Sequence, residues 1–137
     1  MKIHHAASRP SLRAPAAYFT GTVWQDPVVA TEAPARLIAT RVTFEPGART
    51  VWHTHPLGQT LYVLSGVGLV QLEGEAVQEI KPGDTVWIPP GEKHWHGASP
   101  TNGMSHLAMQ EALNGSAVDW LEQVTDGDYL SPVARKV

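Results

Sequence analysis

Apolar and polar residues alternate in short runs over most of this chain, and turn-forming residues separate the runs. Short alternating runs separated by turns every ~8–12 residues are typical of an all-β sandwich or barrel. We expect a first strand within residues 18–30 and further strands between residues 36 and 110. The turn signals of that stretch, all rich in glycine and proline or polar residues, are residues 45–47, 56–58, 65–66, 73–75, 81–84, 89–91 and 100–103.

Only the C-terminal region changes its periodicity. Its apolar residues recur at helical spacing, with Asp119 and Glu122 between them. This pattern predicts one short amphipathic helix, with Ser116 as a candidate N-cap. The apolar positions that suggest it are Ala117, Val118, Leu121 and Val124.

The length and the segment boundaries indicate one folded domain. A chain of 137 residues can bury one substantial core but leaves little room for a second domain. Residues 1–17 are polar and proline-containing, so we expect an N-terminal arm there, with His4 and His5 at its surface. The predicted domain covers residues 18–130, and residues 131–137 form a C-terminal tail.

The composition excludes several classes of site. The chain has no cysteine, so disulfides, thiolate metal sites and cysteine nucleophiles are excluded. The formal net charge is −3 and no basic stripe is present, so we expect neither a nucleic acid nor a membrane as partner. Residues 1–15 lack the apolar core of a signal peptide, which favours a cytoplasmic protein.

Two His-X-His pairs provide the main candidate chemistry. Residues i and i+2 of a strand point to the same face, so His53 and His55 are expected to project together, as are His94 and His96. A turn at residues 56–58 brings the chain back, so that Gln59 can reach the same side from the next strand. Buried imidazole nitrogens need partners, and a shared metal ion satisfies several of them together. We therefore expect a metal site.

These residues resemble the two sequence motifs of the cupin superfamily. Residues 47–66 match the first motif and residues 83–98 the second. The resemblance implies a cupin, jelly-roll-like β-barrel with a short C-terminal helix, and it implies that His53, His55, Gln59 and His94 are the metal ligands. The matching residues are Gly47, His53, His55 and Gly66, with Gln59 in the usual glutamate place, and Gly83, Pro89, Gly91 and His94, with Ala98 in the usual asparagine place.

Glutamine in place of glutamate changes what the metal can do. A neutral amide oxygen leaves more positive charge on the metal than a carboxylate does, so Lewis-acid chemistry is favoured over redox chemistry. Three imidazoles and one amide oxygen suit Mn²⁺, Fe²⁺ or Ni²⁺, and Zn²⁺ remains an alternative.

Further polar residues are candidates for catalysis. His96 shares a strand face with His94 and can therefore act as a general acid or base beside the metal. The alternatives are that His96 is a fifth metal ligand or a packed core residue. His106 and Gln110 share a face of another predicted strand, and His106 is as readily a structural residue. Thr50 could offer its hydroxyl to a substrate oxygen. We expect the rest of the pocket to be lined by Thr40, Val42, Phe44, Leu61, Val63 and Trp87 or its neighbours.

Residues 42–61, 90–98 and 117–120 are similar to the small bacterial cupins that act as manganese-dependent hydroxynitrile lyases. The resemblance implies reversible cleavage of cyanohydrins, such as (R)-mandelonitrile, to an aldehyde and HCN. It also implies Mn²⁺ as cofactor and a small-molecule substrate. Small cupins usually pair through sheet edges and exchanged N-terminal strands, so the resemblance also implies a homodimer or a homotetramer.

Two alternative functions remain open. The first is an oxygen-using enzyme with Fe²⁺ or Cu²⁺ that acts on a small aromatic or enol substrate. Oxygen uptake would separate it from a lyase. The second is a non-catalytic cupin that binds a small ligand without turnover.

Overall fold

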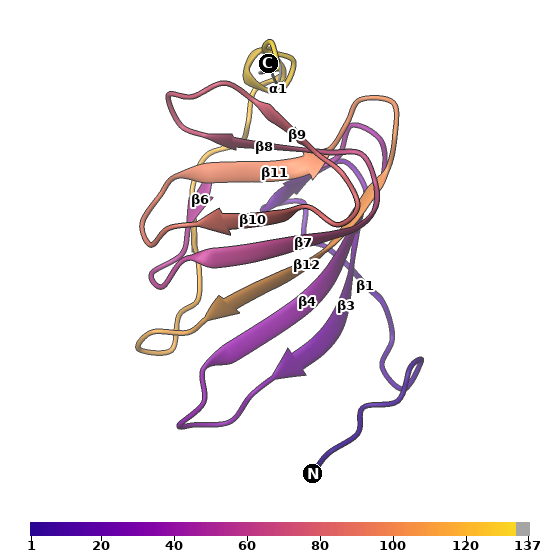
Figure 1. Ribbon diagram of the computed structural model, residues 1–137, viewed down its shortest axis with the longest axis vertical. Helices are drawn as coiled ribbons and strands as arrows, with labels where there is room; N and C mark the ends of the chain where they lie inside the picture. The colour runs from indigo at the N-terminus through magenta and orange to yellow at the C-terminus, as the bar shows by residue number, and fades with distance from the viewer. Residues whose placement is uncertain (134–137) are drawn as a thin grey trace.

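The computed structural model describes residues 1–133, which form two antiparallel β-sheets packed face to face (Figure 1). The all-β prediction is therefore confirmed. The first sheet has the strand order β1 (Leu12–Arg13), β3 (Val23–Ala30), β4 (Leu37–Phe44), β12 (Met104–Glu111), β7 (Gln59–Gly66) and β10 (Thr85–Ile88). The second has the order β13 (Asp119–Trp120), β6 (His53–Thr54), β11 (His94–Ala98), β5 (Arg49–Thr50) and β2 (Phe19–Thr20), with β8 (Gly68–Leu72) beside β11 and β9 (Gln78–Ile80) beside β8.

Alternation along the long strands of the first sheet sets its inner face. In β7, Gln59, Leu61 and Val63 are buried, whereas Tyr62 and Leu64 are exposed on the opposite face. The inner residues fill the space between the sheets with one apolar cluster. Its buried members include Phe19, Val23, Val42, Phe44, Leu61, Val63, Ile88 and Met104.

Strand β11 is central to the second sheet, and all five of its residues are buried. It pairs with β8 along its length and meets β5 and β6 on its other edge. His94 and His96 point into the barrel, whereas Trp95 packs in a separate apolar cluster with Tyr129 and Val124. His94 and His96 therefore share one face of the strand, as alternation predicts.

The helix predicted over Ala117–Val124 is wrong. Residues 119–120 form strand β13, which pairs with β6, and the helix in the described residues is α1 (Asp126–Tyr129). Thr125 caps it by accepting a hydrogen bond from the Asp128 N–H, so Ser116 is not the N-cap. This segment lies along the barrel instead, and its Val118 and Trp120 side chains point into the barrel.

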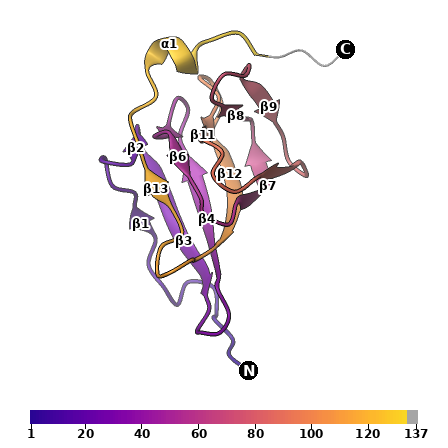
Figure 2. The ribbon, with the colours of Figure 1, turned by 90° about the vertical axis from the view of Figure 1, so that its left-hand side faces the viewer.

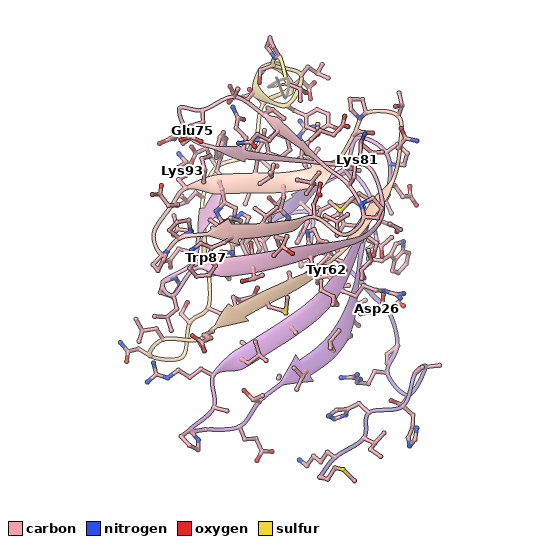
Figure 3. All side chains as sticks on the ribbon, viewed as in Figure 1. Asp26, Tyr62, Glu75, Lys81, Trp87 and Lys93 are labelled. Atoms are coloured by element: carbon pink, nitrogen blue, oxygen red, sulfur yellow. The ribbon has the colours of Figure 1, made fainter. Side chains whose placement is uncertain are left out.

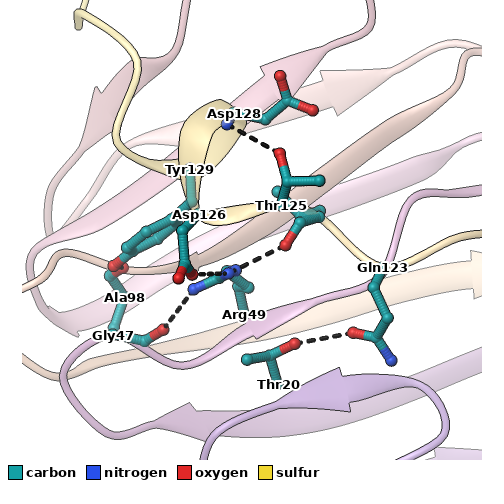
Figure 4. A network of polar contacts seen from close by, with 10 residues as sticks. Thr20, Gly47, Arg49, Ala98, Gln123, Thr125, Asp126, Asp128 and Tyr129 are labelled. Atoms are coloured by element: carbon teal, nitrogen blue, oxygen red, sulfur yellow. Dashed lines mark hydrogen bonds and ion pairs between the residues drawn. The ribbon is translucent and has the colours of Figure 1, made fainter.

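A polar network fastens this C-terminal segment to the barrel (Figure 4). The buried guanidinium of Arg49 donates to the Val124 carbonyl at 2.9 Å and pairs with Asp126 at 2.8 Å. It also lies over the Tyr129 ring, 4.3 Å from the ring centroid. Tyr129 donates its hydroxyl to the Ala98 carbonyl at 2.6 Å. The segment is thus tied to both β5 and β11.

The two ends of the described chain lie at opposite ends of the molecule, with the N-terminus near the tips of β3 and β4 and α1 at the far end (Figure 2). The predicted first strand is divided into β2 and β3, and the arm includes β1, which pairs with β3. His4 and His5 are exposed, as expected. The predicted tail lies outside the described residues from position 134 onward. No helix within residues 1–133 is long and apolar enough to span a membrane.

Candidate metal centre

Five histidines and one glutamine, carried by four strands and one turn, meet inside the barrel. Strand β6 carries His53 opposite His94 of β11, and the turn after β6 carries His55. The ring centroids of His53 and His94 are 4.2 Å apart, and that of His55 lies 5.0 Å from His53 and 5.4 Å from His94. The structure therefore brings the three predicted imidazole ligands together.

Three backbone carbonyls orient these imidazoles. The Nδ1 atoms of His53, His55 and His94 lie 2.8, 2.7 and 2.8 Å from the carbonyl oxygens of Val51, Ala117 and Glu92 respectively. A carbonyl oxygen only accepts, so each neutral ring carries its proton on Nδ1. Each Nε2 atom is then left with a lone pair, which is the form that binds a metal ion.

The contact between Gln59 and His94 also indicates a cation. The Gln59 amide donates through Nε2 to Gln110 Oε1 at 3.0 Å. This hydrogen bond turns the Oε1 atom of Gln59 toward His94 Nε2, 3.2 Å away. With the His94 proton on Nδ1, both facing atoms are acceptors, and neither can donate to the other. A cation between them satisfies both. Among the described residues, the buried Nε2 of His55 also has no hydrogen-bond partner, so the donor set fits a divalent metal.

Three buried histidines also meet the geometric requirement for a metal site. Ligand atoms of His53, His94 and His96 all lie within 4.8 Å of one another, so this group could hold an ion. The group shares His53 and His94 with the predicted ligand set and contains His96 in place of His55. The choice among His55, Gln59 and His96 as further ligands therefore stays a prediction.

Burial keeps these imidazoles neutral. Burial lowers the pKa of His94 to about 4, and it is also the main cause that lowers the pKa of His55. Burial, followed by repulsion from His94 and His55, holds the pKa of His53 well below its usual 6.5. Neutral rings are able to ligate near pH 7, because a protonated imidazole has no free lone pair.

His96 and His106 form a hydrogen-bonded pair beside this cluster. His106 Nε2 lies 2.9 Å from His96 Nδ1, so one proton is shared between the two rings. The buried Nε2 of His96 and Nδ1 of His106 have no partner in the described residues. Burial, followed by the neighbouring His106 and His53, holds the pKa of His96 well below 6.5, and burial lowers the pKa of His106 to about 4.

Thr50 links the two histidine-bearing strands. Its hydroxyl oxygen accepts the His96 backbone N–H at 3.2 Å and lies 3.5 Å from His53 Nδ1. Since His53 Nδ1 donates to Val51, the Thr50 hydroxyl proton has no acceptor there. It remains available to the adjoining cavity.

The cavity between the two sheets is small, with a volume of ≈ 100 Å³. The predicted inward positions Thr40, Val42, Thr50 and Gln110 line it, whereas His106 lies behind His96. The prediction for Trp87 or its neighbours is wrong, because the Trp87 side chain is 59% exposed on the outer face of the first sheet (Figure 3) and Val86 and Ile88 pack in the core. Phe44, Leu61 and Val63 are core residues that do not reach the cavity.

Several residues that line the cavity are not among the predicted ones. Gln25 follows the inward Val23 by two positions on β3, so alternation alone could have found it. Phe19 comes from β2, within the predicted first strand. Ala117, Val118 and Trp120 come from the segment that was expected to be helical.

Comparison with known proteins defines the family. Residues 40–107 match the family model described as a cupin domain. The chain is 60% identical over 129 residues to the (R)-mandelonitrile lyase of Granulicella tundricola, an alignment that covers 94% of this chain and 98% of that protein.

This chain is a cupin. Among solved structures, a cupin-like protein of Thermotoga maritima is 36% identical, with a TM-score of 0.83 over 91% of this cupin and 95% of that chain. The polyketide cyclase RemF of Streptomyces resistomycificus is 21% identical, with a TM-score of 0.71 over 94% of this cupin and 90% of its own chain. The second likeness concerns the fold alone.

Proposed function

We propose that this cupin is a metal-dependent hydroxynitrile lyase that reversibly cleaves aromatic cyanohydrins, of the (R)-mandelonitrile type, to an aldehyde and HCN. The observation that carries this proposal is the 60% identity to an (R)-mandelonitrile lyase over almost the whole of both chains. A cluster of neutral imidazoles beside a small, mostly apolar cavity supports it.

The proposed metal ligands are His53, His55, Gln59 and His94. The support for this set is the three Nδ1–carbonyl contacts and the acceptor pair formed by Gln59 and His94. We propose Mn²⁺ as the metal, with Fe²⁺, Ni²⁺ and Zn²⁺ as alternatives. When bound, such a cation supplies Lewis acidity that stabilises negative charge on a substrate oxygen.

The cavity accommodates the two parts of a cyanohydrin in different places. Apolar side chains from both sheets and from the C-terminal segment suit the organic substituent. They are Phe19, Val42, Ala108, Ala117, Val118 and Trp120. The reacting carbon, its hydroxyl and the nitrile would then face the histidine cluster. In that position the unused Thr50 hydroxyl proton can be donated to the substrate oxygen.

His96 is proposed to move the proton. In cleavage, the substrate hydroxyl loses its proton, the bond between the carbinol carbon and the nitrile carbon breaks, and its electron pair leaves with cyanide. Cyanide then accepts a proton and departs as HCN. His96 lines this site, and its Nε2 has no partner within residues 1–133. The hydrogen bond to His106 lets the ring carry its proton on either nitrogen. Gln110 supports the site by fixing the Gln59 amide.

A reconstitution experiment tests the proposal. Protein depleted with a chelator is reloaded with Mn²⁺, Fe²⁺, Ni²⁺ or Zn²⁺, and its metal content is measured before mandelonitrile cleavage is followed as release of benzaldehyde. We expect cleavage to fall to background without metal and to return on reloading. Equal cleavage rates in chelated and reloaded protein would remove the metal from the proposal, and no cleavage in any loaded form would reject the lyase itself.

A further inference from the structure

The part of the cavity wall formed by β3 and β4 carries two polar side chains that the catalytic proposal does not use. Gln25 of β3 and Thr40 of β4 line the cavity, and both are half-buried. Within residues 1–133 no hydrogen bond holds either side chain, whereas Gln59 and Gln110 of the same cavity bond to each other. Polar groups on a cavity wall that have no protein partner are free to bind a ligand and fix its orientation.

The strand register places an apolar strip between this polar end and the histidines. Strands β3, β4 and β12 follow one another in the first sheet (Figure 1). Val42 of β4 pairs with Gln25 on one side and with His106 on the other, and Ala108 of β12 pairs with Thr40. Since neighbouring strands lie ~4.8 Å apart, β3 and β12 are about 10 Å apart across the strip. The wall is thus polar at both ends and apolar between them.

The second sheet supplies an aromatic wall to the same cavity. Phe19 of β2 and Trp120 of β13 both line it, with their ring centroids 5.9 Å apart. Aromatic side chains on one wall and small aliphatic side chains on the other suit a flat aromatic ring. A ring held between them would direct its reacting substituent to the histidines. A substituent on the far side of the ring would then reach Gln25 and Thr40.

The chemistry of the two side chains favours a neutral hydroxyl group as that substituent. The Gln25 amide offers donors and an acceptor, and the Thr40 hydroxyl offers one donor and acceptor lone pairs, so together they can satisfy a hydroxyl fully. Within residues 1–133, no Asp, Glu, Lys or Arg side chain lines the cavity, so nothing there matches a charged substituent. An apolar substituent would displace water from both groups and leave them unpaired, which disfavours its binding.

We propose that Gln25 and Thr40 form a subsite for a hydroxyl group on the aromatic ring, so that this cupin selects ring-hydroxylated aryl cyanohydrins and the corresponding aldehydes. The inference rests on the proposed lyase function and names the substrate class of that site. Gln25 and Thr40 determine specificity: they contact the remote hydroxyl and take no part in breaking the bond between the carbinol carbon and the nitrile carbon.

Binding of aldehydes to the metal-loaded protein without cyanide tests the subsite apart from turnover. The probes are 3- and 4-hydroxybenzaldehyde, each compared with the chlorobenzaldehyde of the same substitution, and calorimetric titration at pH 6.5 measures their affinities. The variants are Gln25→Leu and Thr40→Val, alone and combined, which remove the polar atoms at similar volume. Gln78→Leu is the matched control, because Gln78 is exposed on β9 and does not line the cavity. Circular dichroism and metal content check that each variant is folded.

We expect the wild type and Gln78→Leu to bind at least one hydroxy isomer more tightly than its chloro counterpart. In the double variant this affinity ratio should fall about 10-fold, the value of one neutral hydrogen bond, and the ratio of kcat/KM for the matching cyanohydrins should fall with it. A wild type without this preference, or an unchanged ratio in the folded double variant, overturns the subsite even if mandelonitrile is cleaved. A preference that the double variant loses supports the subsite even if no cyanohydrin is cleaved, which would reject the lyase alone.

Discussion

At the scale of single residues, the site is built on imidazoles whose proton positions are set by the backbone. The carbonyls of Val51, Glu92 and Ala117 each accept from one Nδ1, so the chain fixes the ligating nitrogen before any ion arrives. This arrangement reduces the cost of ordering the site on metal binding, as outer hydrogen bonds do in metalloproteins.

The roles of His55 and His96 can be separated by measuring metal content and turnover on the same samples. Loss of a residue that only hydrogen-bonds to a metal ligand lowers metal affinity by ~10–100-fold. In His55→Ala a ligand itself is removed, so we expect a larger fall in metal affinity. In His96→Ala we expect full metal loading with cleavage slowed ~10²–10⁴-fold, the usual contribution of a general acid or base.

His5→Ala serves as the control, since His5 is exposed on the arm. Loss of metal from His96→Ala together with retention in His55→Ala would show that His53, His94 and His96 are the ligands, and the assignment of His96 as acid–base residue would then be withdrawn.

Gln59→Glu tests the effect of the neutral ligand. A carboxylate should hold the divalent ion more tightly and reduce its Lewis acidity, so we expect slower release to chelator and a lower kcat. The Gln110 amide can turn its Nε2 donor toward the new carboxylate, so the hydrogen bond between the two positions is kept in the variant. Stopped-flow chelation and steady-state kinetics measure the two effects. Faster metal release from Gln59→Glu would contradict ligation through this residue.

At the scale of elements, the C-terminal segment is part of the site as well as a cover for the barrel. It supplies the carbonyl that orients His55, the backbone that pairs with the His53 strand and the side chains of Val118 and Trp120 in the cavity. Arg49 fastens this segment next to Thr50, so the anchor and the site share strand β5.

Arg49→Met should loosen that segment. The variant loses the hydrogen bond to Val124, the pair with Asp126 and the contact with the Tyr129 ring, so we expect about 1–3 kcal/mol less stability in urea unfolding. Amide exchange should rise first in residues 112–130. Asp126→Asn is the matched control and should change stability by less than ~1 kcal/mol, because Asp126 is 87% exposed. Equal exchange in Arg49→Met and wild type would refute the anchoring role.

The same elements show how far sequence reasoning reaches. His94 and His96 share a face because alternation within one strand is a local property, and the turn that carries His55 and precedes Gln59 is equally local, whereas the roles of these residues stay predictions. Trp120 falls within the predicted helix but is extended, because Asp119 and Trp120 pair with β6, which is distant in sequence. The outward position of Trp87 could not be read either, because a strand with apolar residues on both faces gives no alternation.

At the scale of the whole molecule, one sheet carries three of the five histidines of the site and the other forms the opposite wall of the cavity. His53, His94 and His96 belong to the second sheet, whereas Gln25, Thr40, Val42, Ala108 and Gln110 belong to the first. The site is therefore complete only when the two sheets are packed together, and its loss should accompany unfolding of the whole domain.

The buried histidines predict how the metal-free protein responds to acid. Their pKa values are lowered below 6.5 in the folded state, to about 4 for His94 and His106, so the unfolded chain binds more protons between pH 6.5 and 4. By linkage, the contribution of these neutral histidines to the free energy of unfolding is fully present above pH 6.5. It is lost as the pH falls toward 4, by about 1.4 kcal/mol per pH unit for each such histidine.

Urea unfolding of metal-free protein at pH 7.5, 6.0 and 5.0 measures this loss, because carboxylates contribute mainly below pH 5. His106→Gln should reduce the slope. A free energy of unfolding that stays constant from pH 7.5 to 5.0 would contradict the predicted protonation states.

The position of Trp120 gives the protein an internal optical signal for occupancy of its centre. The indole ring lies 5.0 Å from the His53 imidazole and stacks on Tyr18 at 4.8 Å. A paramagnetic ion held by His53 would quench the emission of so close an indole, while a diamagnetic ion of equal charge would not. Fluorescence during titration with Mn²⁺ or Zn²⁺, compared in wild type and Trp120→Phe, would thus report filling of the centre without any substrate.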